Sequence, residues 1–226
     1  MSQSNGATTL TMQQAEVMPT VMPDGNGEAV SQVIFRYVPK SKVAQFTIRG
    51  KSPLLTNKIR ERSVEEIRVK QDLGTRGKKG KRDKKSDFEQ SMHIMPDGST
   101  YGFPASGVKE AMVTAIRQVD FTSMAAGERL FYVLGEPRLI PLRCSRPVMQ
   151  EEIVYLGQNA KSADLCYRAR FDEWEMDVRI RYNAEVISED QLATLLGIVG
   201  ESIGLGSWRL ENNGWYGAFE VVGAAV

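Results

Sequence analysis

The sequence lacks a long hydrophobic run. None of its 226 residues lies in a window approaching the roughly 18 apolar residues that cross a membrane. The opening residues, MSQSNGATTLTMQQ, lack the basic region and apolar core of a signal peptide. We therefore expect a cytoplasmic protein without membrane contact. Hydrophobic residues make up 42% and charged residues 25%, which is ordinary for a folded chain and excludes wholesale disorder.

Histidine and cysteine are scarce. The chain has one histidine, His93, and two cysteines, Cys144 and Cys166, too few for a Cys₂His₂ zinc site. Acyl-transfer triads and histidine metal clusters need an imidazole beside a nucleophile or metal. His93 lies in SMHIMPDG, just before a Pro-Asp-Gly turn, and this position favours a loop or hairpin histidine over a general base. We predict no catalytic residue and no metal site.

Charge is distributed unevenly. The whole chain has a formal net charge of +1. Residues 51–85 hold 13 Lys and Arg against five acids, a net +8, whereas the remainder holds 16 basic and 23 acidic residues, a net −7. Attraction of a polyanion depends on the local field, so a near-neutral total does not exclude nucleic acid as a partner. The like charges and glycines of 74–85 predict mobility without counter-charge.

The basic segment is therefore our first candidate nucleic-acid contact. A solvated loop without a partner, or an acidic protein partner, stays open as an alternative. The residues predicted to meet phosphate here are Lys51, Asn57, Lys58, Arg60, Arg62, Arg76, Lys78, Lys79, Lys81, Arg82, Lys84 and Lys85.

The N-terminal part differs from the rest. We predict a flexible arm over 1–42, polar at first, with a β-prone stretch, VIFRYV (33–38), that would serve as an edge strand or pair with a neighbouring subunit. A folded domain is predicted over 43–226, with the basic insertion at 57–98.

Periodicity predicts the elements of the folded domain. Strands are indicated at 42–50 and, by strict alternation, at 173–182, with shorter β segments between 129 and 172. A short helix is expected at 63–73, a hairpin over 88–103, and longer helices at 104–119 and 188–204. A glycine-punctuated loop then leads to a last strand. This order predicts an α+β fold with a ferredoxin-like βαββαβ core.

The glycine-rich loop offers both backbone and aromatic surface. Its glycines allow close approach of a ligand, and its aromatic rings offer stacking surfaces for bases. It is neither a Walker loop nor a dinucleotide fingerprint. Packing of the tryptophans in the core or in a subunit interface stays open, and Trp174, on the alternating strand, is expected in the core. The candidate nucleic-acid contacts of the loop are Trp208, Arg209, Trp215 and Tyr216.

Three segments in order resemble the RAMP superfamily, the repeat-associated proteins that form the backbone of CRISPR effector complexes. They are FTIRGKSPLLTN after the first strand, YGFPASGVKEAMVTAIR at the first long helix, and GLGSWR with NNGWYGAFEVV before the last strand. The resemblance spans residues 43–222. It implies an RRM-like core, no cofactor, and assembly along single-stranded RNA or, in divergent members, DNA. A stand-alone viral or plasmid-borne member would fit the compact chain.

The resemblance also implies particular contacts. Ser106 and Lys109 at the helix start would meet backbone phosphate, and a helix N-terminus beside a lysine is independently suited to an anion. The insertion at 57–98 occupies the place of a thumb-like hairpin that crosses the nucleic acid. Glu110 stands where the family has a small residue, which leaves the phosphate contact of this turn open.

We therefore expect a sequence-tolerant binder of single-stranded nucleic acid that self-associates into a multi-subunit, filament-like coat. The stretch SPLLTNKIRER has neither the Asp nor the His with which some family members cleave RNA. A nuclease that uses acids between Glu151 and Asp177 is the enzymatic alternative. A protein-interaction scaffold or inhibitor acting through the arm is the third.

Overall fold

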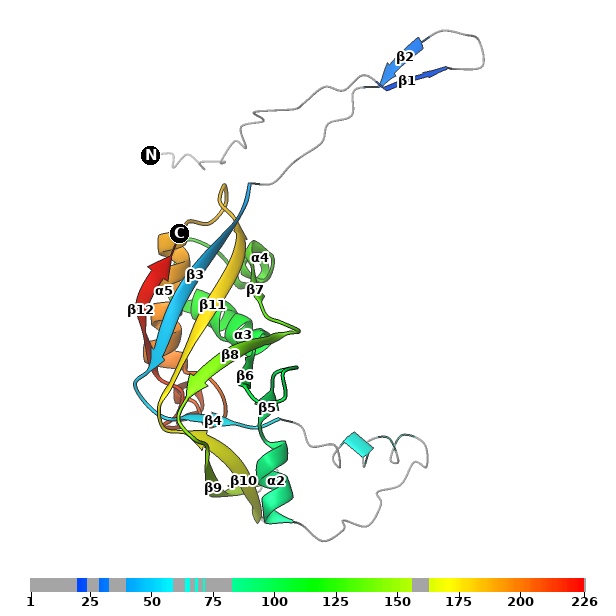
Figure 1. Cartoon of the computed structure of the whole chain (residues 1–226). Coiled ribbons are helices and arrows are strands. Elements are labelled where there is room, and N and C mark those ends of the chain that lie inside the picture. The colour runs from blue at the N-terminus through cyan, green and yellow to red at the C-terminus, as the bar shows by residue number, and fades with distance from the viewer. Residues whose placement is uncertain are drawn as a thin grey trace, which may run out of the picture. The chain divides into compact units, whose positions relative to one another are not determined.

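The computed structural model describes residues 20–23, 29–32, 40–58, 64–65, 68, 71, 83–155 and 163–225 (Figure 1). Contacts divide the chain into two units, Met1–Lys40 and Ser41–Val226. In the first unit, β1 (Thr20–Pro23) pairs antiparallel with β2 (Ala29–Gln32). The β-prone stretch 33–38 and the helix expected at 63–73 fall outside the described residues, apart from isolated positions of the latter. No helix in the described part is long and apolar enough to cross a membrane.

A large antiparallel sheet forms the centre of the second unit. Its strand order is β12-β3-β11-β8-β6-β5, and β7 also pairs with β11. The strands are β3 (Ser41–Gly50), β5 (His93–Ile94), β6 (Tyr101–Pro104), β7 (Phe131–Leu134), β8 (Leu139–Cys144), β11 (Trp174–Asn183) and β12 (Phe219–Ala225). β3 and β11 lie at its centre because both of their edges are paired.

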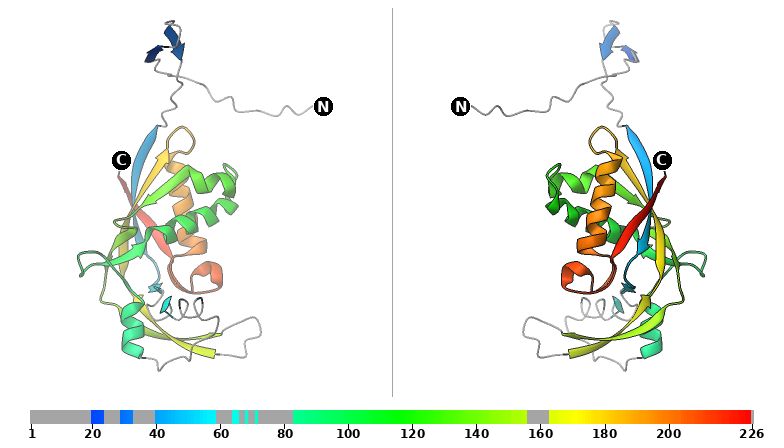
Figure 2. Two further views of the ribbon diagram at one scale, coloured as in Figure 1. Left: turned by 90° about the vertical axis from the view of Figure 1, so that its right-hand side faces the viewer. Right: turned by 90° about the vertical axis from the view of Figure 1, so that its left-hand side faces the viewer.

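Alternation explains which face of this sheet is buried. On β11, Trp174, Met176 and Val178 are almost fully buried, and Phe46 and Ile48 on the paired strand β3 are completely buried. The helices α3 (Ala105–Ala115) and α5 (Glu189–Ile198) lie against this face, and the opposite face carries no helix among the described residues (Figure 2). The outward side chains of the same strands are therefore exposed to solvent.

The helices begin where the sequence supplies caps or a proline. Ser188 and Gln191 form a capping box at the start of α5. α3 follows Pro104 and continues into the 3₁₀ turn η1 (Ile116–Gln118), and α5 continues into the π-helical turn η2 (Val199–Ile203). The path β3, α3, β7, β11, α5, β12 is the βαββαβ core, which confirms the predicted α+β ferredoxin-like fold.

A second, small sheet lies next to the start of the basic insertion and its helix α2. Its order is β4-β10-β9, with β4 (Leu54–Thr56), β9 (Val148–Tyr155) and β10 (Ala163–Phe171) all antiparallel. The helix α2 (Lys84–Gln90) packs on β10, beyond the end of the large sheet (Figure 1). Residues 59–63 and 72–82, which hold most of the positive charge, lie outside the described residues.

Two predictions of local structure were wrong in part. The stretch 88–95 was expected as a strand, but α2 extends to Gln90 and only His93 and Ile94 pair with β6. Asp83 starts the helix, since its side chain accepts the Lys85 N–H at the N-cap. A further short helix, α4 (Met124–Leu130), was not expected, and Ser123 caps it in the same way. Both helices have seven residues, too few to establish a period.

Ser91 joins the insertion to the small sheet, and its removal should destabilise the fold. Its hydroxyl accepts the Ala169 N–H at 2.8 Å in a buried setting, and its carbonyl accepts the Lys58 N–H. Ser91→Ala leaves a buried donor unpaired and should lower the free energy of unfolding by about 1–3 kcal/mol in urea denaturation. Ser86→Ala, within the helix α2 that Ser91 follows, is the control and should change the free energy of unfolding by under about 1 kcal/mol. Equal stability of the two variants would contradict this role.

Candidate nucleic-acid interface

The glycine-rich loop, residues 204–218, is fixed to β4 by its own backbone. The Ser207 N–H donates to the Leu55 carbonyl at 2.8 Å, and the Gly217 N–H donates to the Pro53 carbonyl at 2.8 Å. A Cβ at Gly206, whose φ is +80°, would lie 2.4 Å from the Leu55 oxygen, so only glycine allows this approach. The loop is therefore a defined platform on the small sheet, and several of its amides are already used in holding it there.

Two tryptophans project from this platform toward solvent. Trp215 is 81% exposed and Trp208 is 41% exposed, whereas Trp174 is 3% exposed, as expected for the core. Trp208 has a φ of +51°, an uncommon conformation for a bulky residue. Its carbonyl accepts the Tyr216 N–H at 3.2 Å, which joins the two halves of the loop. Packing of Trp208 and Trp215 in the core of this chain is thus excluded, and a subunit interface stays open.

Arg209 and Tyr216 are less accessible than the two tryptophans. The Arg209 guanidinium makes an ion pair with Glu211 at 2.7 Å within the loop. Burial raises the pKa of the half-buried Tyr216, and Glu152 on β9 raises it further. The phenol therefore stays protonated at neutral pH as a hydrogen-bond donor.

The basic insertion leaves from β4 and returns at α2. Asn57 and Lys58 follow β4 and are exposed, as are Lys84 and Lys85 at the start of α2. Lys84 contacts the Tyr167 ring at 5.2 Å and lies 3.7 Å from Glu151, and these contacts raise its pKa. The exposed Lys51 pairs with Glu201 at 2.7 Å, which raises its pKa as well.

The described residues thus bring part of the predicted interface together. The insertion begins directly after β4 of the small sheet, on which the glycine-rich loop is fixed, and its helix α2 packs on β10 of the same sheet. The remaining predicted contacts of the insertion fall outside the described residues: Arg60, Arg62, Arg76, Lys78, Lys79, Lys81 and Arg82.

Ser106 and Lys109 lie on the first and second turns of α3. Ser106 is exposed, and the Lys109 ammonium lies 5.5 Å from the centroid of the Tyr132 ring. The Arg181 guanidinium lies at the same distance from this ring. Neither Tyr132 nor Arg181 was among the predicted contacts. The alternation of residues 173–182 already placed Arg181 on the solvent side, but the pairing of β7 with β11 cannot be read from the sequence.

The acids considered for a nuclease lie mostly in ion pairs. Arg143 binds Glu175 at 2.8 Å and Asp177 at 2.6 Å on the open face of the large sheet. The hydrogen bonds from Arg143 lower the pKa of both carboxyls. Glu152 pairs with the buried Arg168 at 2.9 Å, yet burial raises its pKa. Among the residues described, no three His, Cys, Asp or Glu are grouped so that they could hold a metal ion.

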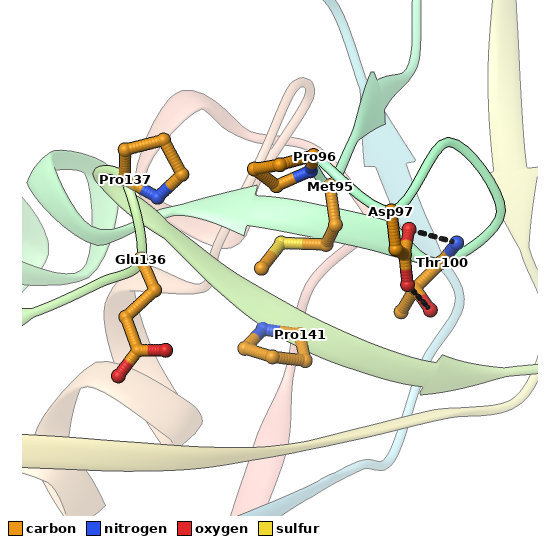
Figure 3. Close-up of a pocket in the computed structure, with 7 residues that line it drawn as sticks. All are labelled: Met95, Pro96, Asp97, Thr100, Glu136, Pro137 and Pro141. Carbon is orange, nitrogen blue, oxygen red and sulfur yellow. Dashed lines mark hydrogen bonds between the residues drawn. The ribbon is translucent and has the colours of Figure 1, made fainter.

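A shallow pocket of about 290 Å³ opens between the β5–β6 turn and the β7–β8 turn. It is lined by Met95, Pro96, Asp97, Thr100, Glu136, Pro137 and Pro141 (Figure 3). Hydrogen bonds, first from the Thr100 hydroxyl, lower the pKa of Asp97 to about 2. Two carboxylates among prolines repel phosphate, so this pocket is not part of the candidate interface.

Of the comparisons with known proteins, one with a solved structure bears on the fold. No protein-family model matches the sequence, and no relative is found among curated protein sequences. A chain from the cryo-EM structure of the Type III-B Cmr-beta bound to cognate target RNA matches with a TM-score of 0.50 at 12% identity. The match covers 82% of this chain and 60% of that chain, so this chain spans about 60% of its length. Cmr6 from Pyrococcus furiosus matches with a TM-score of 0.42 at 9% identity, over 81% of this chain and 100% of that one. The match to the Cmr-beta chain concerns the fold alone.

His93 should titrate below the usual range of a histidine. Burial lowers the pKa of this half-buried imidazole, and the nearby Lys58 lowers it further. Because the chain has one histidine, a single imidazole C2–H resonance reports it, and its midpoint should lie below about 6.5. Lys58→Gln should raise the midpoint, and Lys85→Gln, the control, should leave it unchanged.

The same shift affects stability. A lowered pKa means that His93 contributes stability above about pH 6.5, and this contribution is lost as the pH falls toward the folded-state pKa. A resonance that titrates at or above 6.5 would contradict the proximity of Lys58 and the burial of the ring.

Proposed function

We propose that the protein binds single-stranded RNA or DNA without cleaving it and coats it as a multi-subunit assembly. The observation that carries this proposal is the position of Trp215. Its ring is 81% exposed on a loop hydrogen-bonded to β4, a strand that lies within the +8 segment 51–85. A stacking surface is thus attached to the part of the chain in which the sequence concentrates positive charge. This combination is typical of sites that bind single strands with little sequence preference.

The fold supports the same proposal. The Cmr-beta structure that this chain resembles was determined with target RNA. An ion-paired sheet face and the pairing of most candidate acids with arginines favour binding over hydrolysis. Phosphate attraction would come from the insertion and base contact from the loop, so affinity would depend on salt and tolerate changes in sequence.

Trp215→Ala tests the stacking contact. It should weaken binding of a labelled 15-nucleotide single strand by about 1–3 kcal/mol in fluorescence anisotropy, with an unchanged salt slope. The melting temperature should stay the same because the ring is largely exposed. Phe121→Ala removes another exposed ring, 39% accessible, that is not part of the loop, and is the control. A lower melting temperature with unchanged affinity would instead indicate a packing role.

Joint neutralisation of Lys78, Lys79, Lys81 and Arg82 to Gln tests the basic segment. Binding should weaken for RNA and DNA alike, and the slope of log K against log salt should fall by up to about 3, since each contact with a single strand contributes about 0.7. Thermal stability should not change. An unchanged slope would remove the insertion from the interface.

Two measurements address the wider proposal. Protein purified without nuclease should elute as a large particle with high absorbance at 260 nm relative to 280 nm. Labelled strands incubated with divalent metal should stay intact. Cleavage that a chelator abolishes would favour the nuclease alternative, and co-purification of a polypeptide without nucleic acid would favour the scaffold.

A further inference from the structure

Tyr132 and its two cationic neighbours form a cluster at the β7 edge of the large sheet, where α3 and β11 both reach the ring. Tyr132 is 52% exposed on β7, directly opposite Arg181 of β11 in the strand register. Lys109 reaches the ring from α3, and both cations lie 5.5 Å from its centroid. Three elements far apart in the sequence thus converge on one exposed aromatic ring, which we call the Tyr132 cluster.

The cations of this cluster differ from the other arginines of the large sheet. Arg49, Arg143 and Arg179 each pair with a carboxylate, the last with Glu136 at 3.4 Å. Within the described part of the chain, neither Lys109 nor Arg181 makes an ion pair with an acid. Two cations held near each other without a counter-charge repel, so the site gains from an anion.

The Tyr132 ring is the second feature of the cluster, beside its two cations. Tyr132 is the one aromatic residue at the outward positions of the described strands β3, β7, β8 and β11. About half of its surface stays exposed although the Lys109 ammonium and the Arg181 guanidinium both lie over the ring. An exposed aromatic on an open sheet stacks with nucleic-acid bases, and flanking cations bind the adjoining phosphates.

We propose that Lys109, Tyr132 and Arg181 form a second contact for the bound single strand, separate from the glycine-rich loop. Lys109 and Arg181, which lie over the ring in this structure, turn to the phosphates on either side of one base, and Tyr132 stacks on that base. The ligand class is a nucleotide within a single strand. This inference rests on the proposed function and assigns the residues that would guide the strand over the sheet.

Substitutions that separate ring from charge test the cluster. In anisotropy with the 15-nucleotide strand, Tyr132→Leu should weaken binding about 5- to 100-fold at unchanged salt slope, and Tyr132→Phe should bind as the wild type. Arg181→Gln should weaken binding and lower the slope by about 0.7. Arg179→Gln is the matched control, because this arginine faces the same way two residues earlier and already has a carboxylate partner. Arg179→Gln should change the affinity and the salt slope less than Arg181→Gln does.

Two further arms identify the ligand chemistry. Inorganic polyphosphate of similar length should lose affinity with Arg181→Gln and keep it with Tyr132→Leu, since it has no base to stack. A strand that carries 5-iodouridine should crosslink to the peptide containing Tyr132, and Tyr132→Leu should abolish this crosslink. Unfolding midpoints of all variants should match the wild type within a few degrees.

The outcomes separate this inference from the proposed function. If the wild type binds the strand and Trp215→Ala weakens it, while Tyr132→Leu and Arg181→Gln behave as the wild type, the cluster is not a contact and the proposed function stands. Equal losses for Tyr132→Leu with strand and polyphosphate would overturn the stacking role. If the wild type binds no oligonucleotide even at low salt, both proposals fail.

Discussion

The pairing of β3 with β11 is the constraint on which the other features depend. Along this pair, Phe46 and Val178 lie opposite each other on the buried face, and Gln45 and Arg179 lie opposite each other on the open face. A slip of one residue would expose the apolar set, so the register is strongly specified. Because β12 adds to β3 while β7 and β8 add to β11, this register also determines which side chains of those strands face solvent. The Arg143 ion pairs and the Tyr132 cluster follow from it.

The elements that could be predicted are those with a repeated period. Apolar and polar residues alternate without a break over 173–182, and the helix at 105–115 buries residues at three- and four-residue steps. Each pattern repeats often enough within one stretch of sequence to identify the strand or the helix. The small sheet was not predictable in this way. β4 has three residues, and its partner in β10 lies more than a hundred residues along the chain, so only the tertiary fold brings them together.

In the candidate site, too, features with a local sequence signal could be predicted, and features that depend on the tertiary fold could not. Composition was enough to single out the glycine-rich loop and the basic segment, because glycine, tryptophan and lysine have distinct chemistry wherever they lie. It could not separate the exposed Trp215 from a packed ring, since the loop has no period from which burial can be inferred. Composition also gave no sign of the carboxylate partners of Lys51 and Arg209. The convergence of Lys109 and Arg181 on the Tyr132 ring depends on the β7–β11 register, which composition does not contain.

The ion pairs on the open face have a consequence for selectivity. A polyanion is attracted by cations without nearby carboxylates, and acids next to arginines repel it. Neutralisation of Arg49 and Arg143 by Glu175 and Asp177 therefore leaves the middle of the sheet unattractive to phosphate. The remainder of the chain outside 51–85 has a net charge of −7, which strengthens this effect. On the proposed function, a single strand would be held where unpaired cations and exposed rings coincide, so the distribution of surface charge would limit the path of the strand over the protein.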